Sequence, residues 1–193
     1  RQGVQVMDVA AREAEVVRET RETKVEARLR LDGSGEADAR IPDEFLRHMV
    51  ETLSRYSGAD LDISASGDLA HHLIEDVAIT LGRAYRQAMG DGPVKRIASA
   101  TVPMDEALVQ VTVDLVDRPY AHLEVPDIMY EHFLRSFVME LRATVHTMVI
   151  RGKDDHHIVE ATFKALGLAL KDAMGPSQAV LSTKSNVVWR DGT

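Results

Sequence analysis

One short motif occurs twice in this chain, and its duplication constrains the fold more than any other feature. The motif is His-His-x-x-Glu, found at 71–75 and again at 156–160. An offset of about 85 residues is too long for a solenoid repeat and suits two fused half-domains. The copies continue to match through 81–90 and 166–175, where Leu-Gly, Ala and Ala-Met-Gly recur. The sequence therefore predicts an internally duplicated chain.

Both copies of the motif are expected to open an α-helix. Apolar residues recur at helical spacing in each segment, and a glycine follows where the helix should end, at Gly90 and Gly175. The first histidine and the glutamate stand four positions apart, which places their side chains on one surface of a helix. Neighbouring histidines point about 100° apart, so a pair serves two ions more readily than one.

Imidazole and carboxylate groups in this arrangement favour a transition-metal site. Together they suit manganese, iron, zinc or cobalt better than magnesium or calcium. A single copy of the motif is more often a solvated helix start that is compatible with the helix dipole. Two copies inside a longer repeat favour a metal site built from both halves. His146, expected to open the strand before the second motif, is a further candidate, whereas His48 taken alone is more typical of a histidine at the edge of a core.

Composition narrows the class of protein. With 193 residues, 45% of them hydrophobic, the chain can bury a sizeable core in one compact domain. A formal net charge of -8 argues against a general nucleic-acid surface. There is no cysteine for a disulfide or a thiolate site. No apolar run approaches a membrane span and no signal peptide is visible, so we expect a cytoplasmic protein without a membrane contact.

Strands are expected before each of the paired-histidine helices. Alternation at 24–31 and a β-branched run at 108–115 predict strands, while residues 13–23 alternate only weakly. Further helices are expected to begin near Pro42 and Glu131.

Each half thus has strands, a helix, a strand and a histidine helix. We expect an α/β chain of the α+β two-layer sandwich type, with a sheet backed by two helices in each half. The half-repeats are expected to span residues 1–92, with an N-terminal arm, and 93–193, with a C-terminal tail. Together they should form one catalytic domain.

Several further motifs accompany the paired histidines in a fixed order. They lie at 21–23, 31–35, 45–49, 103–108, 114–119, 131–133, 160–165 and 182–184. With the two histidine motifs, they resemble the imidazoleglycerol-phosphate dehydratase family of histidine biosynthesis. The resemblance covers about residues 18–184.

The resemblance implies a metal-dependent hydro-lyase that converts imidazole glycerol phosphate to imidazole acetol phosphate and water. It implies two manganese ions per active site and a large homo-oligomer built from trimers, with active sites at subunit interfaces. Carried over by motif, the metal ligands are His48, His71, His72, Glu75, His146, His156, His157 and Glu160. The substrate-binding residues are Glu22, Arg96, Arg118, Ser182 and Lys184, and the unranked catalytic acid/base candidates are Glu22, Glu75 and Glu160.

The chain departs from the usual family pattern near these residues. Arg47 replaces an aspartate beside His48, Tyr56 stands where a histidine is usual, and Ser185 replaces a glycine. None of these changes removes a carried-over metal ligand. A diverged paralogue, non-catalytic or with an altered substrate, is the alternative interpretation. A metal hydrolase is a third, because paired His and Glu sites also activate water.

Overall fold

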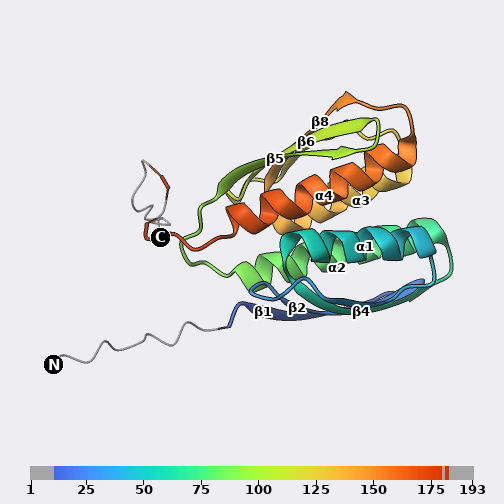
Figure 1. The fold of residues 1–193 in the computed structure, drawn as a ribbon. Helices are drawn as coiled ribbons and strands as arrows, with labels where there is room; N and C mark the ends of the chain where they lie inside the picture. Colours follow the sequence, from blue (N-terminus) through green and yellow to red (C-terminus); the bar gives the residue numbers. More distant parts are fainter. Residues whose placement is uncertain (1–10, 180, 183–193) are drawn as a thin grey trace, which may run out of the picture.

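The chain folds into four layers, with two sheets outside and two layers of helices between them (Figure 1). The computed structural model describes residues 11–179 and 181–182, which form eight strands and four helices. Three strands, a helix, a strand and a helix follow one another, and the same order then repeats. Both half-repeats expected from the motif are therefore present, each a four-stranded sheet backed by two helices. The two-layer expectation holds for each half, and the halves meet through their helical layers.

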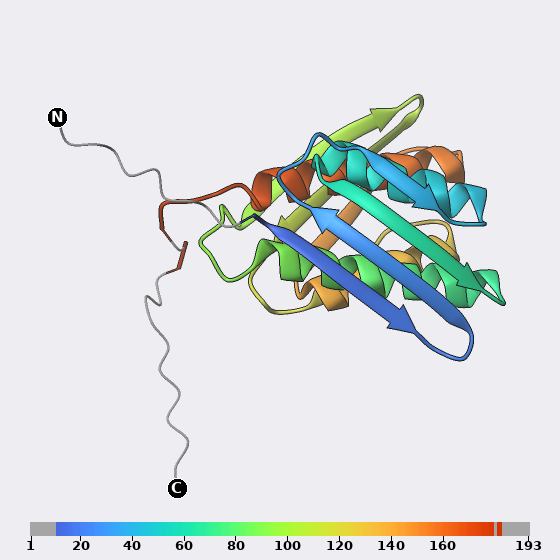
Figure 2. The same cartoon turned by 90° about the horizontal axis from the view of Figure 1, so that it is seen from below.

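The first half forms the sheet that faces the viewer in Figure 2. Its elements are β1 (Glu13–Glu19), β2 (Thr23–Arg30), β3 (Ala37–Arg40), α1 (Glu44–Ser57), β4 (Asp60–Gly67) and α2 (Ala70–Met89). The strand order is β1-β2-β4-β3, and only β3 runs parallel to its neighbour. Val25, Ala27 and Leu29 of β2 are buried while the residues between them are exposed. This alternation buries one face of the sheet against the helices and leaves the other in solvent.

The second half repeats this topology. Its elements are β5 (Ile97–Met104), β6 (Ala107–Asp114), β7 (Tyr120–His122), α3 (Ile128–Leu141), β8 (Thr144–Arg151) and α4 (Asp155–Ala173). The strand order is β5-β6-β8-β7, with β7 parallel to β8. The short parallel strand thus occupies the same edge position as β3 in the first half.

Three elements differ from the sequence-based expectations. The weakly alternating segment after residue 12 is a full edge strand, β1, because seven residues of it pair with β2. Helix α3 begins at Ile128, before Glu131, because the Asp127 side chain accepts hydrogen bonds from the backbone N–H groups of Met129 and Tyr130. Strand β8 begins at Thr144, which pairs with β6, so His146 lies inside the strand rather than at its start.

All four helices begin at the same end of the molecule. The ring of Phe45 in α1 lies 4.9 Å from that of Tyr130 in α3 and 4.8 Å from that of His156 in α4. The ring of His71 in α2 lies 5.3 Å from that of His132 in α3. Each of these residues belongs to the first two turns of its helix. The positive ends of four helix dipoles therefore gather where the paired histidines lie.

The helical layers approach closely at one glycine in each histidine helix. A Cβ atom at Gly82 would lie 2.4 Å from the carbonyl oxygen of Phe137 in α3. A Cβ atom at Gly167 would lie 2.7 Å from the Cβ of Tyr56 in α1. Neither contact is sterically allowed in a close-packed interior. The repeated Leu-Gly pair in the sequence therefore marks the contacts between the two halves.

The core is shared by both halves. Its largest fully buried rings are Tyr85, Phe133, Phe137 and Phe163. The hydroxyl of Tyr85 lies 2.8 Å from the Oγ atom of Ser57, and burial raises the pKa of Tyr85 to about 12. Within the described residues, no helix has the length and apolar character needed to cross a membrane.

Candidate metal and substrate site

Side chains of both halves meet at Glu160. The Nε2 atoms of His48 and His156 each lie 3.3 Å from its Oε2 atom. His156 precedes Glu160 by one turn of α4, whereas His48 reaches it from α1. The ammonium group of Lys164 lies 2.9 Å from the other carboxylate oxygen, Oε1. Two imidazoles thus converge on one oxygen while a lysine holds the other.

The surroundings of Glu160 keep it ionised. The residue is only 6% exposed, and this burial alone would raise its pKa. Hydrogen bonds from Lys164 and His48 outweigh the burial, so the pKa of Glu160 lies below that of an ordinary glutamate. The carboxylate is therefore available as an anionic ligand near neutral pH.

His157 faces the turn between β5 and β6. Its Nδ1 atom lies 2.7 Å from Oε2 of Glu106, and its Nε2 atom lies 3.6 Å from Oδ2 of Asp105. The other oxygen of Glu106 accepts hydrogen bonds from the backbone N–H groups of Asp154 and Lys153. These amides and His157 lower the pKa of Glu106 to about 2. The hydrogen bond with Glu106 in turn raises the pKa of His157.

The first motif makes a related set of contacts. The Nδ1 atom of His72 lies 2.9 Å from Oδ1 of Asp68 and 3.5 Å from Oε2 of Glu22. The hydrogen bond with Asp68 is the main cause that raises the pKa of His72. Glu75 is half-buried one helical turn after His71. The turn between β1 and β2, which carries Glu22, therefore lies beside the first motif.

His132 was not selected from the sequence, but it occupies a position equivalent to His48. Both stand five positions after the aspartate N-cap of their helices, Asp43 and Asp127. His48 contacts the second motif, and His132 contacts His71 of the first. The equal spacing from the two caps is the signal that identifies His132. Sequence reasoning also missed Asp68, Glu106 and Lys164, whose proximity to the motif residues depends on the packing of turns and helices.

His146 lies on the face of the second sheet that is turned away from the helices. It is exposed, whereas its neighbours Val145 and Thr147 are buried. The rings of Tyr120 and His122 lie 5.5 Å and 5.7 Å from the ring of His146. The sheet therefore separates His146 from the helices of its own chain. The exposed large apolar residues on β5, β7 and β8 are Ile97, Tyr120, Met148 and Ile150.

Arg96 lies at the opposite end of α4 from His156. Its backbone N–H donates to the carbonyl oxygen of Ala173, at the last residue of the helix, over 2.8 Å. Because an α-helix rises about 1.5 Å per residue, roughly 25 Å separates Arg96 from His156 in one chain. The Arg96 guanidinium donates to both oxygens of Asp114, at 2.7 and 3.2 Å, and to the carbonyl oxygen of Leu181, at 2.5 Å.

Two other predicted substrate-binding positions, Arg118 and Ser182, lie near Arg96. The backbone carbonyl of exposed Arg118 accepts a hydrogen bond from Thr144, and Thr144 pairs with Asp114. Exposed Ser182 follows the residue whose carbonyl oxygen binds Arg96. Lys184 lies outside the described residues.

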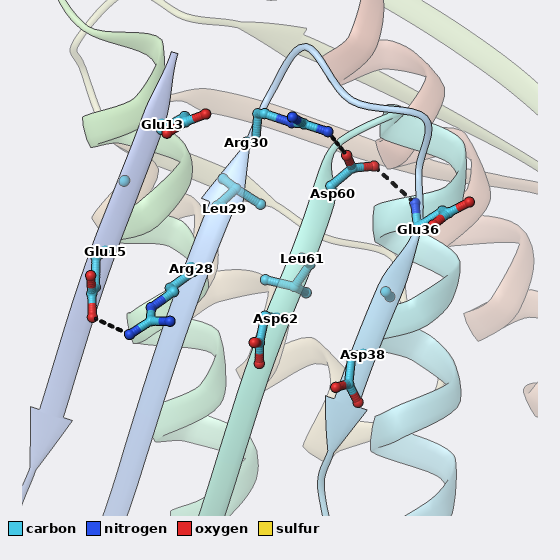
Figure 3. Close-up of a pocket in the computed structure, with 12 residues that line it drawn as sticks. Glu13, Glu15, Arg28, Leu29, Arg30, Glu36, Asp38, Asp60, Leu61 and Asp62 are labelled. Atoms are coloured by element: carbon cyan, nitrogen blue, oxygen red, sulfur yellow. Dashed lines mark hydrogen bonds and ion pairs between the residues drawn. The ribbon is translucent and has the colours of Figure 1, made fainter. Parts of the chain in front are cut away.

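A hollow of about 620 Å³ lies elsewhere, over the outward face of the first sheet (Figure 3). Charged side chains line it, and they pair with one another. Arg28 lies 3.2 Å from Glu15, and Asp60 accepts hydrogen bonds from Arg30 and from the backbone N–H of Glu36. The hydrogen bond with Arg30 is the main cause that holds the pKa of Asp60 well below its usual range. This hollow is not lined by the motif histidines.

The donor atoms at Glu160 suit a transition ion. In the described part of the chain, no cluster of three or more histidine, cysteine or acidic side chains forms a complete metal site. Ligands about 2.1 Å from one octahedral ion lie about 3 Å from each other. The distances of 3.3 Å from Oε2 of Glu160 to His48 and His156 are close to that spacing. The residues present therefore fit part of a metal site.

Comparison with known proteins identifies the family. The family model described as imidazoleglycerol-phosphate dehydratase matches residues 42–170. The enzyme of that name from Dictyoglomus thermophilum is 42% identical over 186 residues, covering 91% of this chain and 99% of the relative. The solved structure from Pyrococcus furiosus has a TM-score of 0.80 at 37% identity and covers 89% of this chain and 100% of that one. The Staphylococcus aureus structure has a TM-score of 0.75 at 30% identity, with coverage of 86% and 99%. The chain belongs to the imidazoleglycerol-phosphate dehydratase family.

Proposed function

We propose that this chain is a subunit of a metal-dependent dehydratase that converts imidazole glycerol phosphate to imidazole acetol phosphate and water in histidine biosynthesis. Family membership over most of the chain supports the proposal. So does the convergence of His48, His156 and Glu160, which gives the expected donor chemistry. A non-catalytic or altered-substrate paralogue would have the same donor atoms, but it would not turn over imidazole glycerol phosphate.

The separation of Arg96 from His156 carries a further part of the proposal. The two residues lie at opposite ends of α4, about 25 Å apart, and one small substrate cannot bridge that distance. We therefore propose that the Arg96 end of one copy lies beside the histidine end of another, in a large homo-oligomer built from trimers. His146, exposed on the outward face of the second sheet, then belongs to such a contact between copies. The apolar side chains around it fit a protein interface.

The metal proposal assigns two manganese ions to each complete site. The residues that would hold them are His48, His71, His72, Glu75, His146, His156, His157 and Glu160. When bound, the ions would supply Lewis-acid stabilisation of the imidazole ring in its anionic form.

The protein side chains then bind and deprotonate the substrate. Glu22 is exposed at the turn beside His72 and is not a proposed metal ligand. Glu75 and Glu160 both belong to the proposed ligand set, and Glu160 is also buried and held by Lys164. Glu22 is therefore the carboxylate that we assign as the base for the carbon-bound proton. Arg96, oriented by its two hydrogen bonds with Asp114, would bind the phosphate together with Arg118, Ser182 and Lys184. Loss of the proton and of hydroxide leaves an enol, which becomes the ketone.

A metal-exchange assay tests the proposal. The full-length protein is stripped with a chelator and dialysed, and manganese or magnesium is added back with imidazole glycerol phosphate. We expect imidazole acetol phosphate to form with manganese and not with magnesium. Protein that retains manganese without turnover would support the paralogue alternative. Release of inorganic phosphate instead of water would support a hydrolase.

A further inference from the structure

A buried carboxylate next to the first motif has no role in the proposed chemistry. Asp76 follows Glu75 in α2 and is only 7% exposed. Its Oδ1 atom accepts a hydrogen bond of 2.7 Å from Nε of Arg18, and its Oδ2 atom accepts one from the hydroxyl of Thr23. Arg18 compensates the buried charge, which would otherwise be strongly destabilising. The bond to Thr23 leads away from the helix, into the turn between β1 and β2.

The hydrogen bonds beyond Asp76 run in one direction. Because the hydroxyl of Thr23 donates its single proton to Asp76, its oxygen is the acceptor toward Thr20, whose Oγ1 atom lies 3.1 Å away. Thr20 Oγ1 in turn accepts from the backbone N–H groups of Glu22, at 3.1 Å, and Thr23, at 3.0 Å. The carboxylate therefore sets the direction of every bond in this hydroxyl chain, which we define as Asp76, Thr23 and Thr20.

The hydroxyl chain ends at the backbone of Glu22, whose other backbone group is held as well. The carbonyl oxygen of Glu22 accepts from the backbone N–H of Asp68 at 3.1 Å. The turn is closed by the N–H of Thr20, which donates to the carbonyl oxygen of Thr23 at 2.9 Å. The side chain of Glu22 then reaches to 3.5 Å from His72. The backbone that carries this exposed carboxylate is thus held at both its N–H and its carbonyl group.

The second half holds its corresponding glutamate in another way. Glu106, in the turn between β5 and β6, accepts directly from the backbone N–H groups of residues 153–154. The residue of α4 that corresponds to Asp76 is Ala161, which is fully buried and offers no acceptor side chain. The duplicated halves therefore differ at this point, and the carboxylate is present in the half that carries Glu22.

We propose that Asp76 is a positioning residue that acts through the hydroxyls of Thr23 and Thr20 to hold Glu22 at the substrate site. This role rests on the proposed function, in which Glu22 takes the proton from the substrate. Both carboxylate oxygens of Asp76 are engaged by Arg18 and Thr23, so its role is assigned to positioning and not to substrate or metal binding. A fixed carboxylate loses less freedom when it reaches the transition state than one on a mobile turn.

The hydroxyl chain can be tested without any activity. Hydrogen exchange at the amides of Glu22 and Thr23 is measured in the full-length protein by mass spectrometry. We expect Thr23→Val to speed this exchange about tenfold or more, and Thr23→Ser, which keeps the hydroxyl, to leave it unchanged. Thr80→Val is the matched control, because the buried hydroxyl of Thr80 bonds only within α2, to the carbonyl oxygen of Asp76. Unchanged exchange in Thr23→Val would overturn the proposal.

A double-mutant cycle then separates positioning from general structural support. Thr23→Val and Asp76→Asn are expected to lower kcat about tenfold with little change in KM. In a Glu22→Gln background, either substitution should cause almost no further loss, because the hydroxyl chain acts only through Glu22. An equal loss in both backgrounds would overturn the positioning role. A wild-type protein without turnover would remove the proposed function, and the exchange experiment would still decide for or against the hydroxyl chain.

Discussion

The Nε2 atom of His48 lies 3.3 Å from Oε2 of Glu160, although the two residues belong to different halves of the chain. His156 approaches the same oxygen from one turn earlier in α4. The proposed ligand set therefore spans the halves, and it would link metal binding to the packing of α1 against α4. Gly167 allows that packing, because a side chain there would meet Tyr56.

Removal of either histidine should weaken metal retention. We expect His48→Ala or His156→Ala to lower manganese affinity by about 100-fold, because each deletes a proposed ligand rather than a supporting contact. Metal content after equilibrium dialysis at fixed free manganese measures the effect. Arg55→Ala is the control, since Arg55 is exposed in the last turn of the same helix as His48. Equal metal content in all variants would contradict the assignment.

Two inactive variants should restore activity when their chains are mixed. Arg96→Ala and His156→Ala are each expected to abolish most turnover. If complete sites combine these residues from different copies, random mixing of equal amounts places both native residues in about one quarter of the sites. Denaturation and joint refolding, followed by the dehydratase assay, measure this recovery. Absence of recovery in well-assembled mixed oligomers would place the two residues in the same copy's site.

Gly82→Ala should destabilise the fold. The added methyl group would overlap the carbonyl oxygen of Phe137 and force α2 away from α3. A loss of about 1–3 kcal/mol in the free energy of unfolding is expected from such overpacking. Gly92→Ala provides the control, because a Cβ atom at Gly92 meets nothing within 4 Å. Chemical denaturation of both variants measures the difference, and similar midpoints would show that the helices separate without strain.

Metal binding at His157 should strengthen as the pH rises. The hydrogen bond with Glu106 raises the pKa of His157, and a metal ion must displace that proton. The pKa of His157 is thus higher in the folded protein than in the unfolded chain. The stabilisation from its contact with Glu106 is complete below the ordinary histidine pKa and is lost as the pH rises through the folded-state pKa. NMR titration of the metal-free protein should show a lower pKa of His157 in Glu106→Gln. Calorimetric titration should show the pH midpoint of metal binding moving down with it.

The shift of the His157 pKa and the shift of the metal-binding midpoint test different parts of this prediction. An unchanged His157 pKa in Glu106→Gln would remove the hydrogen bond as its cause. A changed pKa with an unchanged binding midpoint would mean that manganese does not compete with this proton, and so would remove His157 from the ligand set.

The duplicated motif predicted the repeated topology because helix ends and strand alternation are local signals. Strand β1 escaped detection because charged residues alternate with few large apolar ones, and it is pairing with β2 that makes it a strand. Local sequence patterns also did not predict how the two halves pack against each other. An amphipathic helix shows that one face is buried, but it does not show whether a sheet or another helix covers that face.

The candidate site was predictable as residue types and only partly as an arrangement. The sequence indicated that His156 and Glu160 share a helix surface, and the family resemblance already named His48 as a ligand. The structure shows that His48 reaches Glu160 and adds Lys164. The distance from Arg96 to this cluster was not predictable, because it depends on which end of α4 meets β5. Spacing along the chain carries no information of that kind.

The glycine contacts between the helical layers also bear on whether one half could exist alone. A polypeptide with only one half would expose the apolar helix surface that Gly82 and Gly167 now bring together. Such a unit is soluble only when a second copy covers that surface. A half of this chain made alone would therefore need a second copy on the surface that is now the interior of a single subunit.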